Sequence, residues 1–337
     1  PAAAGGAARR RCQCGHSAWS HRSDAASMSA RRQLLSSRPP WWQAEPGPRA
    51  AAVASGSPAQ GSLTRVADEG LLKALQSLLD ATHKQSDNWT RDRGCVAHGV
   101  NRCSPECMHQ NRAPVPIGYT LKQAFRNQSS ALWFRYSLMR CTVQQECSNS
   151  GCERVEVESS LPARAARGTL GGPPLAEEVN EWLLLHGSDY EACTKICEVN
   201  FSLDHAGAGA TWKDTAPLYG HGLYFAERIT KADEYAKLVP PAVAGEASLH
   251  CVLLCRVVGG RVCECTTDRI DAEALRTQVL HGRHHSVLGD RVRHLGKPFR
   301  EVVIHDSDQV YPEYLLMYSR DFVRRPATAS RTASGSG

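Results

Sequence analysis

The sequence lacks several features that would each indicate a particular class of protein. No run of 18 or more apolar residues is present, so no membrane-spanning helix is expected; the longest apolar stretch, "HCVLLCRVV", has the length of a strand. The 14 cysteines do not form the even framework of a small disulfide-rich secreted domain, and no secretory hydrophobic segment precedes them. These absences predict a reducing compartment, nuclear or cytoplasmic, and no membrane partner.

Acidic residues are scarce at the beginning of the chain. Residues 1–65 hold nine Lys/Arg and two Asp/Glu, so the remainder, with 31 basic and 32 acidic residues, is nearly neutral. A basic tail rich in Ala, Ser, Gly and Pro is typical of an unstructured extension. The same composition would suit contact with RNA, DNA or an anionic surface, and it also matches that of an organelle-targeting transit peptide. All three interpretations stay open.

The rest of the chain is long enough for a substantial core and shows an α+β pattern. Leucines at helical spacing predict an amphipathic helix from about Asp68 to His83, and "NQSSALWFRYSLMR" predicts a second helix. Residues 147–174, rich in Ser, Gly, Ala and Pro, are interpreted as a surface insertion. Strands are predicted at 181–186, 222–226, 248–258, 300–305 and 313–319.

The predicted domain organisation has four parts. They are a basic low-complexity tail at 1–65, a helix with a Cys/His-rich segment at 66–112, a folded domain at 113–325, and a disordered tail at 326–337.

The stretch "LLLHGSDYE" carries the first candidate site residues. His186 and Gly187 lie at the end of an apolar strand, and Ser188 with Glu191 has the form of a capping box that starts a helix. Gly187 would let a ligand approach the backbone closely. His186 could hydrogen-bond a ligand, although a neighbouring carbonyl could equally satisfy its ring.

The stretch "PLYGHGLYFAERITKADEY" supplies two tyrosines. Tyr224 lies on a short predicted strand, and Thr230 and Asp233 have the spacing of a helix cap, so Tyr235 should lie on the helix that follows. The two rings could face each other across a gap that suits a flat heteroaromatic ring. Packing of both rings in the core is the alternative.

The stretch "QVYPEYLLMYS" places a carboxylate in an apolar strand. Glu313 should share a face with Leu315 and Met317 because strand side chains alternate with period two. Pro312 suits the beginning of a strand, where a missing N–H is tolerated.

Taken together, these blocks resemble the diphtheria-toxin-like ADP-ribosyltransferases of the poly(ADP-ribose) polymerase family, tankyrases included. "HGS", "LYGHGLYFAE…ADEY" and "VYPEYLLMY" are similar to the three signature blocks, and "FREVVIHDSDQVYPEY" is similar to the closing strand pair. The resemblance implies two facing antiparallel sheets that hold NAD+, which is consumed as its nicotinamide–ribose bond is cleaved. ADP-ribose would pass to acceptor proteins, so no G-x-G-x-x-G motif is required, and none is present.

The resemblance also implies a role for each site residue. His186 would bind the adenosine ribose, Gly187 and Ser188 would belong to the nicotinamide pocket, and Tyr235 would stack on the ring. Tyr224 would be the middle member of a His-Tyr-Glu triad. Glu313 would be the catalytic glutamate, which bonds the ribose 2′-hydroxyl, polarises an acceptor and permits chain elongation without proving it.

Three departures from the family pattern stand out. Ala232 occupies the position at which many family members have a serine that bonds the nicotinamide carboxamide. The absence of that serine would remove a contact of about 0.5–1.5 kcal/mol. Asp204 occupies the position of an arginine in a Phe-Asp-x-Arg motif. No long helical regulatory region precedes the blocks, which argues against the DNA-break-activated subgroup. The acceptor loop would span about 263–297.

A Cys/His cluster precedes the catalytic blocks. Cys95, His98, Cys103 and Cys107 give the spacing C-x2-H-x4-C-x3-C. Four such ligands could close a tetrahedral Zn2+ site, although the spacing departs from that of C-x2-C knuckles and unliganded thiols are the alternative. If catalysis is absent, this cluster and the basic tail predict a silent module that binds RNA.

Overall fold

The fold is that of a computed structural model of the chain. It describes residues 39, 42, 62–84, 113–160, 170–206, 217–245, 248–267 and 269–322. Every helix and strand named below belongs to the unit that spans Trp41–Gly337. In these ranges no helix has both the length and the apolar character needed to cross a membrane.

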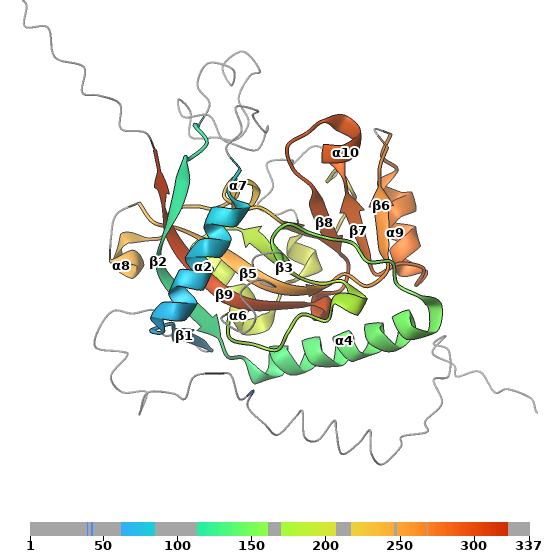
Figure 1. The fold of residues 1–337 in the computed structure, drawn as a ribbon, viewed down its shortest axis with the longest axis horizontal. Coiled ribbons are helices and arrows are strands. Elements are labelled where there is room, and N and C mark those ends of the chain that lie inside the picture. Colours follow the sequence, from blue (N-terminus) through green and yellow to red (C-terminus); the bar gives the residue numbers. More distant parts are fainter. Residues whose placement is uncertain are drawn as a thin grey trace, which may run out of the picture. The chain divides into compact units, whose positions relative to one another are not determined.

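The described strands form one sheet of nine, in the order β1-β2-β9-β5-β3-β4-β8-β7-β6 (Figure 1). Neighbouring strands are antiparallel except β6 and β7, which are parallel. The strands are β1 (Leu63–Arg65), β2 (Gly118–Asn127), β3 (Glu181–Gly187), β4 (Leu223–Ala226), β5 (His250–Val258), β6 (Val262–Cys265), β7 (Ser286–Gly289), β8 (Glu301–Ile304) and β9 (Val310–Asp321).

The α+β class is confirmed, but the expected pair of facing sheets is not found. The two halves of the sheet, β1-β2-β9-β5-β3 and β4-β8-β7-β6, are continuous through β3 and β4. The register of that junction consists of the single pair Leu185 and Ala226. Two groups of strands are therefore present as one sheet, because one narrow pairing joins them.

Helices cover both faces of the larger half. The helices are α2 (Glu69–Thr82), α4 (Ser130–Ser150), α6 (Tyr190–Val199), α7 (Ile229–Ala232), α8 (Pro241–Ala244), α9 (Ala272–Leu280) and α10 (Arg291–Leu295). Short 3-10 helices span Glu177–Val179, Leu203–His205 and Ser307–Gln309. The predicted helix at 68–83 is confirmed as α2, with Asp68 as its N-cap.

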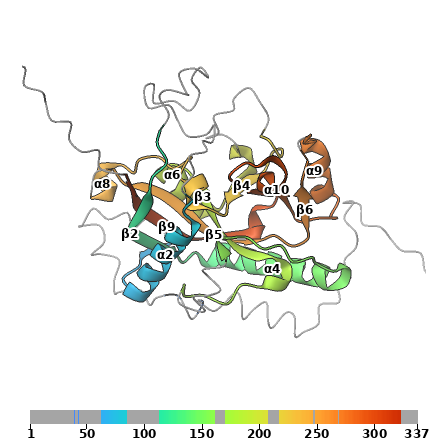
Figure 2. The same ribbon diagram turned by 45° about the horizontal axis from the view of Figure 1, so that its top comes forward.

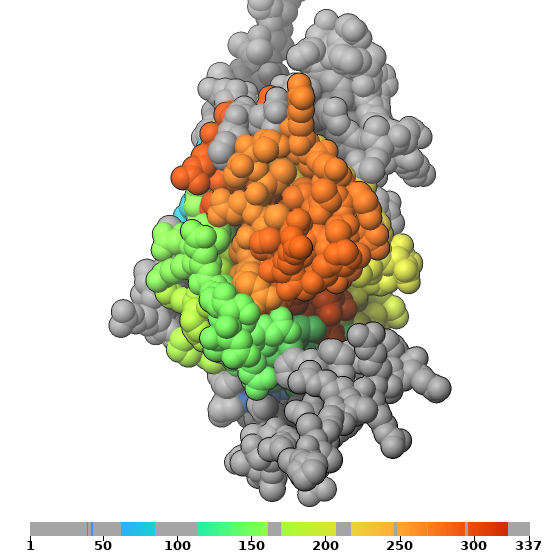
Figure 3. All heavy atoms as spheres, turned by 90° about the vertical axis from the view of Figure 1, so that its right-hand side faces the viewer, coloured from blue at the N-terminus to red at the C-terminus, as the bar shows by residue number. Residues whose placement is uncertain are grey.

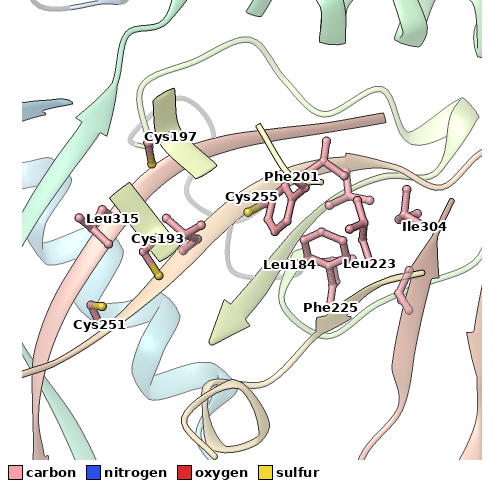
Figure 4. Close-up of a cluster of buried hydrophobic side chains, with 14 of the residues drawn as sticks. Leu184, Cys193, Cys197, Phe201, Leu223, Phe225, Cys251, Cys255, Ile304 and Leu315 are labelled. Atoms are coloured by element: carbon pink, nitrogen blue, oxygen red, sulfur yellow. The ribbon is translucent and has the colours of Figure 1, made fainter. Parts of the chain in front are cut away.

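The leucines of α2 belong to one core cluster, together with Leu183, Leu254 and Leu316. Side chains of α6 belong to the opposite cluster, and Figure 4 shows its cysteines among the apolar side chains there. The long helix α4 packs across the sheet end at which β9 and β3 begin and β5 ends, and Figure 2 shows it running beneath the strands.

The predicted surface insertion at 147–174 is wrong for its first part. Helix α4 continues to Ser150, and Val155 and Val157 are buried in the core. Trp182 of β3 donates its indole N–H to the carbonyl of Val155 at 3.0 Å, so this segment is bonded to the sheet. The composition suggested a loop because Ser and Gly outnumber the buried valines that attach this segment to the core.

Glu313 lies at a β-bulge in β9. Leu254 of β5 pairs with Tyr314, whereas the next residue, Cys255, pairs with Pro312, so Glu313 is the extra residue on β9. A bulge re-aims the side chain of the inserted residue and breaks the period of two. The expected alternation with Leu315 and Met317 is therefore interrupted here.

Glu313, which the resemblance implied to be the catalytic glutamate, is buried inside the sheet. The residue is 2% exposed, and its carboxylate accepts hydrogen bonds from Arg126 Nη2 at 3.0 Å and Arg256 Nε at 2.7 Å. Both arginines lie on the α2 side of the sheet, which the bulge lets Glu313 reach. The carboxylate is an internal ion-pair partner.

The same ion pairs extend to the next strand. Arg256 donates through Nη1 to Glu181 at 3.1 Å, and Glu181 also accepts from Tyr136 at 2.5 Å and lies 3.4 Å from Arg140. Burial opposes ionisation of Glu181, but Arg256 and Arg140 hold its pKa below its usual value. Arg126, Glu313, Arg256 and Glu181 thus form a charge row of alternating sign across β2, β9, β5 and β3.

We expect Glu313→Gln to lower the free energy of unfolding by about 3–5 kcal/mol, because it removes the negative charge that two buried guanidinium groups share. Urea denaturation followed by circular dichroism measures this loss. Glu273→Gln is the matched control: it removes an exposed carboxylate that lies 3.7 Å from Arg276 and should cost less than about 0.5 kcal/mol. Equal losses in the two variants would contradict the role of the charge row.

Candidate active site

The end of β3, the strand β4 and the helix α7 bring four of the predicted site residues together. His186 donates Nδ1–H to the backbone carbonyl of Tyr224 at 3.0 Å. Its ring lies against Phe201 and Phe225, with centroids 5.0 and 5.7 Å away. Burial lowers the pKa of His186, and the bond to Tyr224 opposes this only in part. The imidazole is therefore neutral, and Nε2 keeps a lone pair to accept a hydrogen bond.

Gly187 is in direct contact with the segment that carries Ala232 and Tyr235. A Cβ placed on Gly187 would lie 1.9 Å from the Ala232 carbonyl oxygen and 3.2 Å from Tyr235 Cβ. Only glycine allows this approach between the strand end and α7. The segment therefore meets β3 at its backbone.

Two predicted helix caps are wrong. Helix α6 starts one residue later than expected, and Asp189 rather than Ser188 caps it by accepting from Ala192 N–H at 2.7 Å. Ser188 is half-buried, and its carbonyl accepts from Lys237 N–H at 3.3 Å. Thr230 lies inside the short helix α7 rather than at its cap. Aspartate competes well with serine as a cap, which the spacing alone did not resolve.

Tyr224 is anchored through its hydroxyl. The group donates to the Gly220 carbonyl at 2.8 Å and accepts from Tyr219 N–H at 3.0 Å. Burial, and to a smaller extent the Glu301 carboxylate, raise the pKa of Tyr224, while the bond from Tyr219 opposes them. Tyr224 is consequently a neutral phenol that fixes the loop before β4.

Asp233 ties α7 to the sheet, a role that the sequence analysis did not identify. It is fully buried and accepts from Tyr318 at 2.6 Å, from Arg320 Nε at 2.8 Å and from Tyr119 at 3.2 Å. These donors lie on β9 and β2. Ala232 and Tyr235, on either side of Asp233, are thereby held in place from the larger half of the sheet.

A second glutamate lies close to this assembly. Glu301 begins β8, and its Cα pairs with Ala226 of β4 on one side and Gly289 of β7 on the other. Its carboxylate is 3.6 Å from Lys231 Nζ and 4.0 Å from Arg291 Nη1, and 13% of the side chain is accessible. It accepts no hydrogen bond from a described residue, so its oxygens remain available to a ligand.

The chain around Glu301 is firmly held. Arg300, the preceding residue, makes two hydrogen bonds with the Glu227 carboxylate, at 2.7 and 2.6 Å. Glu227 follows β4 directly, so this bidentate pair fixes the beginning of β8 against the end of β4. Lys231, which is 4% exposed, is in turn held by Glu234 at 3.0 Å. The carboxylate itself is loosely contacted, but its backbone is not free to shift.

The sequence analysis missed Glu301. It belongs to the same stretch, "FREVVIHDSDQVYPEY", in which Glu313 attracted attention through its apolar surroundings. The available signal was an acidic residue at the start of a short apolar strand that ends in His305. Its cross-strand position beside β4, which the tertiary fold decides, was not accessible from the pattern.

The predicted zinc ligands Cys95, His98, Cys103 and Cys107 lie outside the described residues. Within the described ranges, no group of three or more Cys, His, Asp or Glu side chains could hold a metal ion. Cys263 and Cys265 both pack against a small core cluster beneath α9.

We expect Gly187→Ala to destabilise the protein by about 1–3 kcal/mol, because its Cβ must displace a backbone carbonyl oxygen. Thermal and urea unfolding measure the effect. Gly118→Ala is the control, since its nearest neighbour is the flexible end of the Asp321 side chain at 3.2 Å, and a smaller loss is expected. An unchanged unfolding midpoint in Gly187→Ala would contradict the observed approach of α7.

His250 lies beside the Asp233 anchor, and we expect it to make stability depend on pH. Burial, with a further contribution from Arg320, lowers the pKa of His250 to about 4 from the usual 6.5. The unfolded chain therefore binds the extra proton first as pH falls, and the free energy of unfolding should drop by about 1–3 kcal/mol between pH 6.5 and 4. His250→Gln should reduce this slope in pH-dependent urea titrations, whereas the exposed His205→Gln should not. Identical slopes in His250→Gln and wild type would overturn the assignment.

Comparison with known proteins agrees with this geometry. The family model of the poly(ADP-ribose) polymerase catalytic domain matches residues 105–294, which is more than half of the chain. The mouse (Mus musculus) "Protein mono-ADP-ribosyltransferase PARP12" is 25% identical over 201 residues, which cover 60% of this chain and 22% of that protein. The chain thus matches less than a quarter of that relative's length. On the extent of the family match, the chain belongs to the poly(ADP-ribose) polymerase catalytic domain family.

Proposed function

We propose that the chain is an ADP-ribosyltransferase that consumes NAD+ and modifies acceptor proteins. Family membership supports the use of NAD+, and the name of the mouse relative, a mono-ADP-ribosyltransferase, supports ADP-ribose transfer. The observation that carries the proposal is the convergence of Glu301, Lys231 and the His186–Tyr224 pair at the junction of β3, β4 and β8.

The residues at the β3 end are suited to the two halves of NAD+. The backbone of Gly187 would bond the nicotinamide carboxamide, and the Tyr235 ring would stack on the base. His186 Nε2, a hydrogen-bond acceptor in the neutral ring, would bind a hydroxyl of the adenosine ribose. Ser188, half-buried beside Gly187, would line the same pocket.

We assign the catalytic carboxylate to Glu301 instead of Glu313. Both oxygens of Glu313 are already bonded to buried arginines, and the residue is 2% exposed, so a ribose hydroxyl has no access to them in this structure. Glu301 has only ion pairs of 3.6 and 4.0 Å, and it lies on the same face as Tyr224, whose pKa burial and this carboxylate both raise. Lys231, 3.6 Å away, would orient the carboxylate.

The proposed reaction breaks the bond between the ribose anomeric carbon and the nicotinamide nitrogen. The bonding electrons leave with nicotinamide, and the sugar becomes oxocarbenium-like. Glu301 would stabilise that positive charge and bond the ribose 2′-hydroxyl. The acceptor side chain would then attack the anomeric carbon and pass its proton toward the same carboxylate.

Ala232 leaves this pocket one hydroxyl short. The hydroxyl of Thr230, two residues earlier, lies instead against the chain that follows α2: it accepts a hydrogen bond from the backbone N–H of Lys84 at 2.7 Å, and the residue is 1% exposed. Binding of nicotinamide would therefore depend more on the Gly187 backbone and the Tyr235 ring. The missing contact corresponds to about 0.5–1.5 kcal/mol.

Glu301→Gln should reduce transfer of labelled ADP-ribose by about 100- to 1,000-fold, because it removes the charge that stabilises the transition state. Purified protein is incubated with labelled NAD+, and both transferred label and released nicotinamide are measured. Glu264→Gln, which changes an exposed carboxylate on β6, the strand beyond β7, is the matched control and should retain activity. Both variants should fold, as judged by a cooperative unfolding transition in urea.

The results of this assay distinguish an active transferase from a silent binding module. No transfer and no nicotinamide release by the wild type would refute the proposed function, and salt-sensitive RNA binding in that protein would favour the silent binding module. Full activity in Glu301→Gln would refute the assignment of the carboxylate. A ladder of products would show chain elongation, and a discrete band would show transfer of a single unit.

A further inference from the structure

Tyr219 occupies the space that a side chain at Gly289 would need. A Cβ built on Gly289 would lie 2.0 Å from Tyr219 Cζ and 2.4 Å from its hydroxyl oxygen. The absence of a side chain at Gly289 is therefore what admits the phenol end of Tyr219. Gly289 belongs to the smaller half of the sheet, β4-β8-β7-β6. Figure 3 shows the molecule from the side of this half, where the orange atoms of the region around α9 lie beside the green atoms of α4.

Gly289 is the cross-strand neighbour of Glu301. The two residues are direct Cα partners in the antiparallel pair of β7 and β8, so their side-chain positions share one face. Directly paired Cβ positions lie about 4.5–5.5 Å apart. The Tyr219 hydroxyl, which fills the Gly289 position, consequently lies next to the Glu301 side chain.

The charge environment agrees with this placement. Burial, and after it the Glu301 carboxylate, raise the pKa of Tyr219, whereas Arg291 opposes them. The residue is 1% exposed, so the phenol stays protonated and has an O–H to donate. No described residue bonds this hydroxyl, and none donates a hydrogen bond to Glu301.

Tyr219 is also linked to the triad through its backbone. Its N–H donates to the Tyr224 hydroxyl at 3.0 Å, and the Gly220 carbonyl accepts from the same hydroxyl. The loop that carries Tyr219 is therefore fixed relative to β4. A phenol on such a loop can hold a neighbouring carboxylate in one orientation.

We propose that Tyr219 is a positioning residue for Glu301, whose carboxylate it confines between its phenol O–H and Lys231. The assignment rests on the proposed function, since Glu301 is taken as the catalytic carboxylate. The phenol excludes Glu301 from the space above Gly289 and supplies a donor to the carboxylate when substrate draws it inward. Gly289 is needed for this arrangement because any side chain there would displace the hydroxyl.

The kinetic test is Tyr219→Phe, which keeps the ring and removes the hydroxyl. We expect kcat for NAD+ cleavage to fall about 10- to 100-fold with KM changed less than about threefold, as for a bond that forms in the transition state. In a Glu301→Gln background the same change should have no further effect, because Tyr219 acts through Glu301. Additive losses would show that Tyr219 acts independently and would overturn the proposal.

Tyr311→Phe is the matched control for packing. Its hydroxyl donates to the Asn127 carbonyl at 2.5 Å, in the core on the other half of the sheet. This variant should lower stability without changing kcat of the folded protein. An equal fall of kcat in Tyr219→Phe and Tyr311→Phe would show a merely structural effect and contradict the positioning role.

The wild type, Tyr219→Phe, Glu301→Gln and the double variant also report on the contact without catalysis. A double-mutant cycle of urea unfolding for Tyr219→Phe and Glu301→Gln should show coupling of at least about threefold in the unfolding equilibrium constant. If the wild type transfers no label, the proposed function fails, and the cycle still decides whether the two side chains interact. Zero coupling together with an unchanged kcat would overturn the inference while leaving the proposed function intact.

Discussion

The charge row across β2, β9, β5 and β3 is the interaction on which the rest of the structure depends. Arg126, Glu313, Arg256 and Glu181 come from four adjacent strands and are almost fully withdrawn from water. A buried charge without its partner is costly, so slipping any one strand would break at least one ion pair. The row therefore fixes the register of the larger half of the sheet. Because Glu181 is the first residue of β3, the row also fixes the position of the other end of that strand, where the site residues His186 and Gly187 lie.

The candidate site lies where this rigid half meets the smaller one. A junction of one residue pair, Leu185 and Ala226, leaves little backbone pairing to hold the halves together. Side chains supply the missing constraint: Asp233 bonds the segment after β4 to the larger half, and the Arg300–Glu227 pair bonds β8 to the end of β4. A site at such a junction can draw its residues from both halves while each group rests on a fixed support.

The sequence predicted those parts of the fold that depend on local pattern. The leucine spacing located α2, and apolar runs located five strands, because burial of one face imposes a period that the chain displays. His186, Gly187, Tyr224 and Tyr235 were found as motif residues, and the structure brings them to one place. The bulge at Glu313 was not predictable, since one inserted residue changes the face without changing the composition. Glu301 was missed because its importance comes from tertiary neighbours, among them its cross-strand partner Ala226, 75 residues earlier in the chain.

The two glutamates differ in what surrounds their oxygens. Glu313 is held by direct guanidinium bonds of 2.7 and 3.0 Å, so its charge stabilises the register of the sheet. Glu301 is attracted by Lys231 and Arg291 from 3.6 and 4.0 Å, beyond hydrogen-bonding distance, so no described residue occupies its lone pairs. A carboxylate that must accept a substrate hydroxyl needs the second arrangement. In the described structure Glu313 therefore has direct donors on both oxygens and Glu301 has none, and this difference is the reason for proposing Glu301 as the reactive carboxylate.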